Sequence, residues 1–360
     1  MPTLFAEHEV LTELETMPYL PGMTFGDFAE ICRTQHPVLY DRLDFLRISS
    51  SEFSRLLVEL GAMSAHFESK EVGGRGEAYR QGQNRNPLLR ARGIQKLFDL
   101  LKEPEESFSP SDVVVDVLGG NGTLTRAMTK LNSPHTTPTI ITSDAASSMV
   151  HDALLQCLPA IREPAHFLLL KNRSVDKTIF AYGTHHIAPG DRVGAFMEAW
   201  RILKPGGRIV VQDFEEGTPT ARWYSDLLDR YTLTGHKCEH FTPEGMKALV
   251  QEAGFEEVKV QYVYDPFVVT GDDPTEACRG LAEHVCSLFG LEKLLVPPEQ
   301  RDEKFWQKVH EVLRPYGTFL PTDLPRGVDA VSQPTVAYIR GKYVVEFPRV
   351  ALVATGKKDV

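Results

Sequence analysis

The sequence predicts an α/β fold built on a doubly wound parallel sheet, and three observations carry this prediction. The chain of 360 residues changes character near residue 112, where a run of β-branched residues over 113–118 indicates a strand buried on both faces. The glycines Gly119, Gly120 and Gly122 follow this strand, and a helical pattern follows the glycines. From there to residue 264, strand and helix patterns alternate, which is typical of parallel sheets.

The first 110 residues are predicted to form a helical cap, because apolar residues recur at spacings of three and four. The expected helices are Phe25–Cys32, Pro37–Arg47, Ser51–Ser69 and Leu88–Leu101, the last of which follows Pro87. Between them, residues 71–86 are rich in glycine, arginine and asparagine, so this stretch is predicted to be a mobile loop.

The core is expected over residues 111–265, in the order that the alternating patterns give. After 113–118, the expected strands are Thr139–Thr142, Thr178–Tyr182, Arg208–Gln212 and Val258–Tyr264. The expected helices are Thr123–Leu131, Ser147–Leu158, Arg192–Leu203 and Pro243–Ala253. Residues 266–330 are predicted to be a helical insertion that forms a lid, with helix over Pro274–Leu313. Residues 331–360 carry a strand-like pattern over Tyr343–Ala354 that is expected to complete the core.

Composition excludes some partners without identifying a reaction. The net charge of −10 argues against a protein that binds the phosphate backbone of nucleic acid. No run of 18 apolar residues occurs, so no membrane span is expected, and the acidic N-terminus does not fit a signal peptide. The five cysteines are scattered and form no C-x-x-C pair, which favours reduced cysteines in a cytoplasmic protein.

The glycine turn carries the chemical signal. Gly120-Asn121-Gly122 has no third glycine in register, so a dinucleotide fingerprint is weakly supported. The wider stretch Asp116–Gly122, however, resembles the first motif of the class I S-adenosylmethionine-dependent methyltransferases. Four later segments also resemble that family in order: Asp144–Val150, Ser174–Ile187, Glu198–Arg208 and Phe241–Phe255.

The resemblance implies a seven-stranded Rossmann-like sheet and S-adenosyl-L-methionine as the cofactor. The residues that it places at the cofactor are Asp116, Gly119, Gly120, Asn121, Gly122, Asp144, Ala145, Met149, Tyr182 and, from the N-terminal loop, Arg85. A carboxylate accepts hydrogen bonds from both ribose hydroxyls, which suits Asp144, although a helix N-cap is the alternative role. Met149 fits either the adenine side or ordinary core packing.

Two positions depart from the family pattern. Leu118 stands where the family has its first glycine, and no acid after the third strand matches the one that contacts the adenine amine. These departures keep a second reaction open, in which another part of the cofactor is transferred or cyclised and methylthioadenosine is released. A non-catalytic binding protein of the same fold is the third alternative.

Candidate catalytic residues follow the predicted strand Thr178–Tyr182. His185, His186 and Tyr182 lie at the carboxyl edge of a parallel strand, where such sheets bind ligands, and a histidine suits a general base near neutral pH. The pattern His236-x-Cys238-x-His240 resembles metal ligands, but no companion cluster accompanies it, so no metal site is predicted. The leading prediction is a methyltransferase that acts on a small molecule in specialised metabolism. It has no nucleic-acid or membrane partner, and a homodimer remains open.

Overall fold

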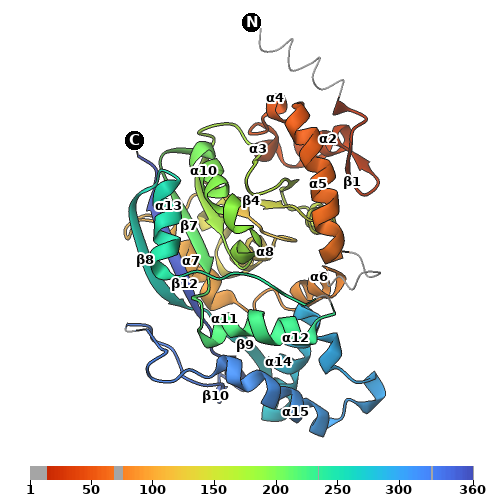
Figure 1. The fold of residues 1–360 in the computed structure, drawn as a ribbon, viewed down its shortest axis with the longest axis vertical. Helices are drawn as coiled ribbons and strands as arrows, with labels where there is room; N and C mark the ends of the chain where they lie inside the picture. Colours follow the sequence, from red (N-terminus) through yellow and green to blue (C-terminus); the bar gives the residue numbers. More distant parts are fainter. Residues whose placement is uncertain (1–13, 69–75, 234, 326, 360) are drawn as a thin grey trace, which may run out of the picture.

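The computed structural model describes residues 14–68, 76–233, 235–325 and 327–359. Figure 1 shows the N-terminal helices at the top, a central sheet with helices on its faces, and α14 (Pro274–Phe289) and α15 (Glu303–Leu313) at the bottom. Among the described residues, no helix combines the length and the apolar character needed to cross a membrane.

The central sheet has seven strands in the order β5-β4-β3-β6-β7-β12-β8, which confirms the predicted doubly wound seven-stranded fold. The strands are β3 (Val113–Val117), β4 (Thr139–Asp144), β5 (Ala160–Arg162), β6 (Val175–Phe180), β7 (Leu203–Asp213), β8 (Glu256–Tyr264) and β12 (Val350–Lys357). The prediction of a wholly parallel sheet is wrong for β12, which pairs antiparallel with both β7 and β8. β8 ends at Tyr264, and β12 begins beside that residue at Val350. The chain therefore re-enters the sheet at the end where β8 left it, so β12 runs in the opposite direction to β8.

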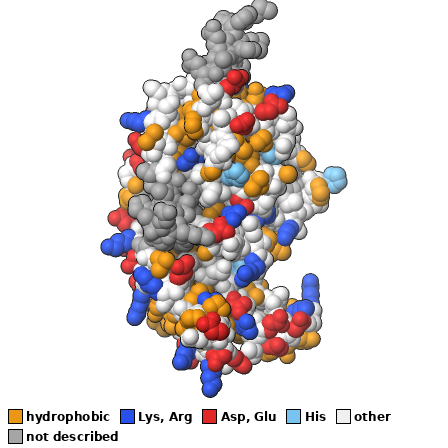
Figure 2. Space-filling model, turned by 90° about the vertical axis from the view of Figure 1, so that its right-hand side faces the viewer, with side chains coloured by type: hydrophobic (Ala, Val, Ile, Leu, Met, Phe, Trp, Pro, Cys, Tyr) orange, Lys and Arg blue, Asp and Glu red, His pale blue; other side chains and the backbone are white. Residues whose placement is uncertain are grey.

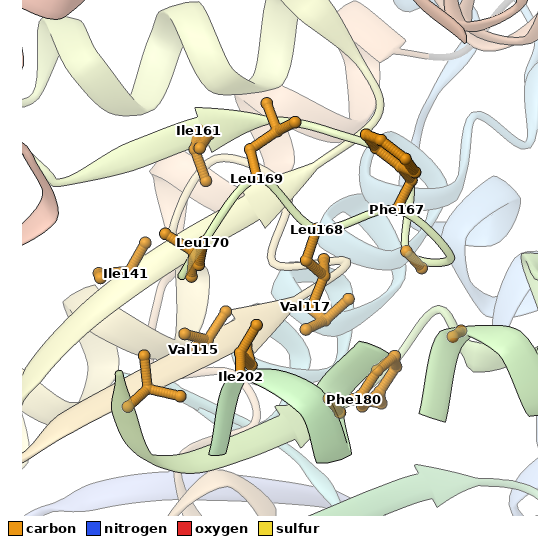
Figure 3. Close-up of a cluster of buried hydrophobic side chains, with 14 of the residues drawn as sticks. Val115, Val117, Ile141, Ile161, Phe167, Leu168, Leu169, Leu170, Phe180 and Ile202 are labelled. Atoms are coloured by element: carbon orange, nitrogen blue, oxygen red, sulfur yellow. The ribbon is translucent and has the colours of Figure 1, made fainter. Parts of the chain in front are cut away.

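Helices cover both faces of this sheet. They are α7 (Ala91–Leu100), α8 (Thr123–Leu131), α9 (Ser147–Leu155), α10 (Arg192–Ile202) and α13 (Pro243–Glu252). Side chains alternate along β3, so Val115 joins one buried cluster with α10 and α13, whereas Val114 joins another with α7, α8 and α14. Figure 3 shows part of the first cluster, where Phe167 and Leu168 from the loop after β5 meet Val117.

The N-terminal cap contains a two-stranded ribbon and short helices. Its elements are β1 (Pro18–Leu20), β2 (Met23–Thr24), α2 (Phe25–Gln35), α3 (Pro37–Tyr40), α4 (Phe45–Ile48) and α5 (Ser51–Glu68). The single helix predicted over Pro37–Arg47 is therefore wrong, because a turn separates α3 from α4. At that turn Leu43 bridges Leu170 and the backbone N–H of Asp44 donates to Leu169.

The mobile loop predicted over 71–86 is largely a helix, α6 (Gly76–Arg85), while residues 69–75 lie outside the described residues. Tertiary packing explains the error. Gly82 lets α6 approach α14 closely, since a methyl group there would lie 2.8 Å from Leu288 Cα. Arg80 also forms an ion pair with Asp152 of α9, which holds the helix against the core.

The insertion is not wholly helical. β9 (Phe267–Gly271) pairs with β11 (Lys342–Phe347), which pairs with β10 (Thr335–Ile339), so a three-stranded antiparallel sheet underlies α14. The strand predicted over Tyr343–Ala354 is therefore two strands, β11 and β12, broken at Pro348 and Arg349. Between β7 and α13 the chain forms α11 (Pro219–Arg222), a π-helix (Trp223–Leu228) and α12 (Asp229–Tyr231).

Figure 2 shows one face of the molecule with its side chains coloured by type, on which acidic and basic groups are interspersed rather than gathered by sign. This mixed surface agrees with the moderate net charge of −10.

Candidate active site

The turn after β3 is shaped by three residues in the left-handed region of backbone conformation. Leu118 has φ +68°, Gly120 +59° and Gly122 +80°. Glycine adopts these angles without steric cost, whereas a leucine there is strained by about 1–2 kcal/mol. Leu118 thus occupies a backbone conformation that glycine adopts without strain.

Asp144 joins this turn to the end of β4. Its Oδ2 accepts a hydrogen bond from the backbone N–H of Gly120 at 2.8 Å, and its Oδ1 accepts one from Ala146 at 2.8 Å. A carboxylate has about four acceptor positions, so one group can accept several hydrogen bonds at this turn. The Ala146 bond also shows that Asp144 caps the turn into α9.

Asp116 is fully buried beneath the turn, and among the described residues neither of its carboxylate oxygens has a hydrogen-bond partner. Burial raises the pKa of Asp116 well above its usual value, and the nearby charge of Asp144 raises it further. A methyl group at Gly119 would lie 2.6 Å from Asp116 Oδ2, so only glycine permits this approach. A buried, unpartnered carboxylate is matched chemically by a cation, such as the ammonium group of an amino-acid moiety.

Helix α6 supports the turn through the side chain of Asn121. Asn121 Nδ2 donates to Asp152 Oδ2 at 2.8 Å and to Asn84 Oδ1 at 3.1 Å, and Arg80 pairs with the same Asp152. The amide of Asn121 therefore holds the turn against α6 and α9. Arg85, predicted at the cofactor, is exposed in the last turn of α6. Burial lowers the pKa of His284 on α14, and the charges of Arg90 and then Arg85 lower it further.

The remaining residues predicted on the cofactor side lie close to Asp144 in the chain. Ala145 is half-buried, and its carbonyl accepts a hydrogen bond from Arg162. Met149 is buried in α9. These positions do not distinguish a cofactor contact from packing, so both roles stay predictions.

Sequence reasoning missed Glu163, because it did not identify the short strand β5 that precedes it. Glu163 is buried, and burial raises its pKa to about 7. One carboxylate oxygen accepts the backbone N–H of Leu169 at 2.6 Å, and its backbone N–H donates to the carbonyl of Asp144. An acid therefore does follow the third strand of the core, but its carboxylate is hydrogen-bonded to the loop whose residues Phe167–Leu170 are labelled in Figure 3.

Tyr182 lies just beyond β6, also with a left-handed backbone at φ +61°. Its hydroxyl donates to Asp265 Oδ1 at 3.1 Å, and Asp265 forms an ion pair with Arg349 at 2.6 Å. A second guanidinium, that of Arg90, lies 4.5 Å from the centre of the Tyr182 ring. Both arginines are buried, so the interior beside Tyr182 holds two cations and one carboxylate.

His185 is buried beside Asp213 at the end of β7, whereas His186 is exposed. A carboxylate only accepts hydrogen bonds, so Asp213 accepts from Nδ1 of His185 and from Nδ1 of His240, each at 3.0 Å. Although burial opposes it, these histidines hold the pKa of Asp213 well below its usual value. The His185 ring also lies 4.8 Å from that of Tyr224 in the π-helix.

The structure thus brings two sets of residues to one edge of the sheet. The glycine turn, Asp116 and Asp144 form one set, whose chemistry would suit a ligand with a cationic group and hydroxyls. Tyr182 and His185 follow β6 at the same edge, next to the buried arginines, where a second ligand would meet the first.

Comparison with known proteins gives the following similarities. Residues 115–211 match a family described as a methyltransferase domain. The chain is 26% identical over 198 residues to the ubiquinone/menaquinone biosynthesis C-methyltransferase UbiE of Pseudomonas aeruginosa (strain LESB58), covering 47% of this chain and 75% of that protein. It is 27% identical over 173 residues to the UbiE protein of Pseudomonas savastanoi pv. phaseolicola (strain 1448A / Race 6), covering 40% of this chain and 65% of that protein.

Among solved structures, the chain is similar to a Bacillus halodurans protein described as a putative methyltransferase. That similarity has a TM-score of 0.43 and 14% identity, and it covers 74% of this chain and 99% of the other. A Haemonchus contortus phosphoethanolamine N-methyltransferase 2 in complex with S-adenosyl-L-methionine has a TM-score of 0.45 and 11% identity, over 79% of this chain and 57% of the other.

Proposed function

We propose that this chain, whose residues 115–211 match a methyltransferase domain, is an S-adenosylmethionine-dependent methyltransferase that methylates an anionic small molecule bound beside Tyr182. One observation carries the proposal for the acceptor: two buried guanidinium groups, those of Arg90 and Arg349, accompany a single carboxylate, Asp265. An acidic group on the acceptor would balance the remaining positive charge.

The residues on the cofactor side fit S-adenosylmethionine. When bound, this cofactor supplies an electrophilic methyl group on a positively charged sulfur. Asp116 would receive its ammonium group, since both carboxylate oxygens lack partners among the described residues. Asp144, which meets the glycine turn at the backbone N–H of Gly120, would accept the ribose hydroxyls, since a carboxylate accepts hydrogen bonds from neighbouring hydroxyl donors. This assignment rests on the orphaned carboxylate and on the family.

The residues on the acceptor side fit an anion with an apolar body. Among the described residues, Nε of Arg90 and both Nε and Nη1 of Arg349 are buried without hydrogen-bond partners. Aromatic rings lie over both guanidinium groups, including Phe267 at 4.2 Å from Arg349 Cζ, and offset part of the cost of burial. A bound carboxylate would satisfy these donors and complete the charge balance.

Proton removal remains a prediction for His185. Its Nδ1 is held by Asp213, which leaves Nε2 to accept a proton from an oxygen or nitrogen acceptor. Methyl transfer is favoured over the reaction that releases methylthioadenosine, because the matched family and relatives are described as methyltransferases. A role in specialised metabolism, a cytoplasmic location and a homodimer stay predictions.

A paired-acceptor assay tests the proposal. The protein is incubated with isotopically labelled S-adenosylmethionine and pairs of carboxylic acids and their neutral esters, and all products are identified by mass spectrometry. We expect S-adenosylhomocysteine together with methylated acid, and poor use of each ester. For Arg349→Met, we expect KM for the acid to rise roughly 10- to 100-fold, as the loss of a charged hydrogen bond of about 1.5–3 kcal/mol implies.

The matched control is Arg92→Met, because Arg92 is largely exposed and pairs with Glu346 away from this interior. Cofactor affinity should be unchanged in both variants. Arg349→Met leaves one arginine for one carboxylate, so we expect it to fold. Equal use of acids and esters, or an unchanged KM in Arg349→Met, would show that the acceptor is not recognised through an anionic group.

A further inference from the structure

Four side chains with metal-binding atoms converge beside β6 and β7, on the acceptor side of the sheet edge. His185 comes from the turn after β6, and the other three, His236, Cys238 and His240, come from the loop between α12 and α13. We call these four residues the imidazole–thiol cluster. The sequence pattern His236-x-Cys238-x-His240 lacked companion residues, and the fold supplies them in His185 and Asp213.

Two pairs of atoms in the cluster lie at the separation expected of two ligands of one ion. Cys238 Sγ lies 3.5 Å from His236 Nδ1 and 3.5 Å from His240 Nε2. Metal bonds of about 2.3 Å to sulfur and 2.1 Å to nitrogen, at the tetrahedral angle, separate such atoms by about 3.6 Å. Ligand atoms of His185, His236 and Cys238 all lie within 4.8 Å of one another.

Asp213 arranges two of the histidines as a metal site requires. Its two carboxylate oxygens accept from the Nδ1 atoms of His185 and His240, so the lone pair of each ring lies on Nε2. Among the described residues, His185 Nε2 is buried without a hydrogen-bond partner. A carboxylate behind a histidine is the usual outer support of a histidine that binds zinc.

The loop that carries the other three ligands is anchored on both sides. Asp229 accepts the backbone N–H of His236 at 2.9 Å, and Arg192 donates to the carbonyl of Glu239 at 2.7 Å. Gly235, at φ +74°, permits the bend that starts this segment, because a methyl group there would lie 2.8 Å from Asp229 Oδ1. The loop therefore presents its side chains in a fixed arrangement.

We propose that the imidazole–thiol cluster binds one divalent transition-metal ion, with zinc the best match to its nitrogen and sulfur donors. Coordination removes the thiol proton of Cys238 to solvent. The thiolate and the carboxylate of Asp213 then offset the two positive charges of the ion, so the buried site is neutral overall.

Metal binding would change the role of His185. One lone pair on Nε2 cannot both coordinate an ion and accept a proton, so a bound metal excludes His185 as the general base. The ion would then lie near Tyr224, whose ring is 4.8 Å from that of His185. The inference does not depend on methyl transfer, because the binding measurement uses neither cofactor nor acceptor.

The experiment measures metal binding to the full chain, purified without a histidine tag and stripped with a chelator. Zinc is titrated in competition with a chromophoric chelator, and cobalt(II) is added separately to report the ligands by absorption. We expect one zinc per chain, and a cobalt complex with the thiolate charge-transfer band of a sulfur ligand.

Substitutions assign the ligands. Cys238→Ser should abolish the charge-transfer band, because it removes the sulfur ligand. Asp213→Asn should weaken zinc binding by roughly 10- to 100-fold, because Asp213 only supports two ligands, and Cys238→Ser should weaken it more. The controls are Cys157→Ser and His135→Ala, which change exposed residues elsewhere and should bind zinc like the unaltered protein. Circular dichroism of each chelator-stripped variant verifies folding.

Two results would overturn the proposal: zinc binding below one ion per chain at micromolar concentration, or unchanged affinity and absorption in folded Cys238→Ser. If zinc binds but no methyl transfer is found, the proposed function fails and the metal site stands. If methyl transfer occurs without metal, and both Cys238→Ser and Asp213→Asn bind zinc like the unaltered protein, the metal site fails and the proposed function stands.

Discussion

The proposed cofactor side and the proposed acceptor side of the sheet edge use different parts of the chain. On the cofactor side, the turn residues and Asp144 lie within one contiguous stretch, and backbone N–H groups and backbone angles define the surface. On the acceptor side, the charged groups run from Arg90 to Arg349, and buried side chains define the surface.

This difference separates two ways of building a binding site. The shape of a glycine turn depends on local backbone conformation, so a motif of a few residues is enough to predict it. A buried group of two arginines and one aspartate forms only where the elements that carry them pack together. Burial matters because an unbalanced charge is costly inside a protein and not in water. Four predictions test this contrast, from the largest expected effect to the smallest.

Asp116→Asn should have the largest effect, and it should act on the cofactor side alone. Loss of the charge that faces the cofactor ammonium should weaken S-adenosylmethionine binding by about 3 kcal/mol, roughly 100-fold, in isothermal titration. The cofactor-free variant should be more stable than the unaltered protein, increasingly so as the pH rises.

The sign of that stability change follows from the raised pKa of Asp116. In the folded protein the carboxyl keeps its proton at a pH where the unfolded chain has lost it, so stability falls as the pH rises. Asparagine has no such ionisation. Unaltered cofactor affinity in a folded Asp116→Asn protein would contradict its assignment to the cofactor.

Glu163→Gln should remove a pH dependence of stability on the cofactor side. The pKa of Glu163 is raised by burial to about 7 in the folded protein, from an ordinary value of 4.5. The stability that protonated Glu163 contributes to the folded protein is therefore fully present below pH 4.5 and is lost as the pH rises through about 7. Between about pH 5 and pH 8, the variant should gain about 2–3 kcal/mol relative to the unaltered protein in urea unfolding.

The glutamine amide in this variant retains an oxygen for the backbone N–H of Leu169, so the loop contact should survive. The control is Glu244→Gln, because Glu244 is a surface residue in the first turn of α13. A constant stability difference between Glu163→Gln and the unaltered protein across this pH range would contradict the burial argument.

Gly82→Ala tests the helix that connects the two sides. A methyl group there would lie 2.8 Å from the backbone of Leu288, so α6 and α14 must separate, at about 1–3 kcal/mol of unfolding free energy. The matched control is Gly61→Ala in α5, where nothing lies within 4 Å and alanine should stabilise by about 0.5–1 kcal/mol. Chemical denaturation measures both, and a stabilised Gly82→Ala would show that the helices are not in close contact.

Leu118→Gly should have the smallest effect. Glycine relieves about 1–2 kcal/mol of left-handed strain but loses leucine packing and adds chain entropy, so unfolding free energy should change by less than about 1 kcal/mol. Cofactor affinity should stay within about threefold. Leu118→Ala is the comparison, because it keeps the strain and loses the packing, so it should be about 1 kcal/mol less stable than Leu118→Gly. Equal stabilities would contradict the left-handed backbone at this position.

Several elements could be predicted because their signals are local. The helix Thr123–Leu131 has the bounds that its apolar spacing gives, and β3 and β4 follow their β-branched runs. β5 was missed, since three residues carry no periodicity, and with it the acid Glu163. The helix α6 was missed because glycine and arginine normally favour loops, and packing on α14 overrode that preference.

The candidate site divides in the same way. The glycine turn, Asp116 and Asp144 were identified from the sequence, as was the position of His185. The arginines, Asp265 and the partners of His185 were not. Arg90, Asp265 and Arg349 look like ordinary charged residues in a sequence, and nothing local distinguishes a buried arginine from an exposed one.

By itself, the sequence determined the doubly wound fold and the glycine turn that is the candidate cofactor site, because each depends on side-chain periodicity or on backbone angles that neighbouring residues set. Only the tertiary structure decided that β12 runs antiparallel, that α6 is a helix, and that His185 and Asp213 lie beside His236-x-Cys238-x-His240. The physical reason is that the carboxyl edge of a sheet collects residues from distant segments. Once these residues are buried, their charges and lone pairs need partners, and the spacing of residues along the sequence does not show which residues will be buried.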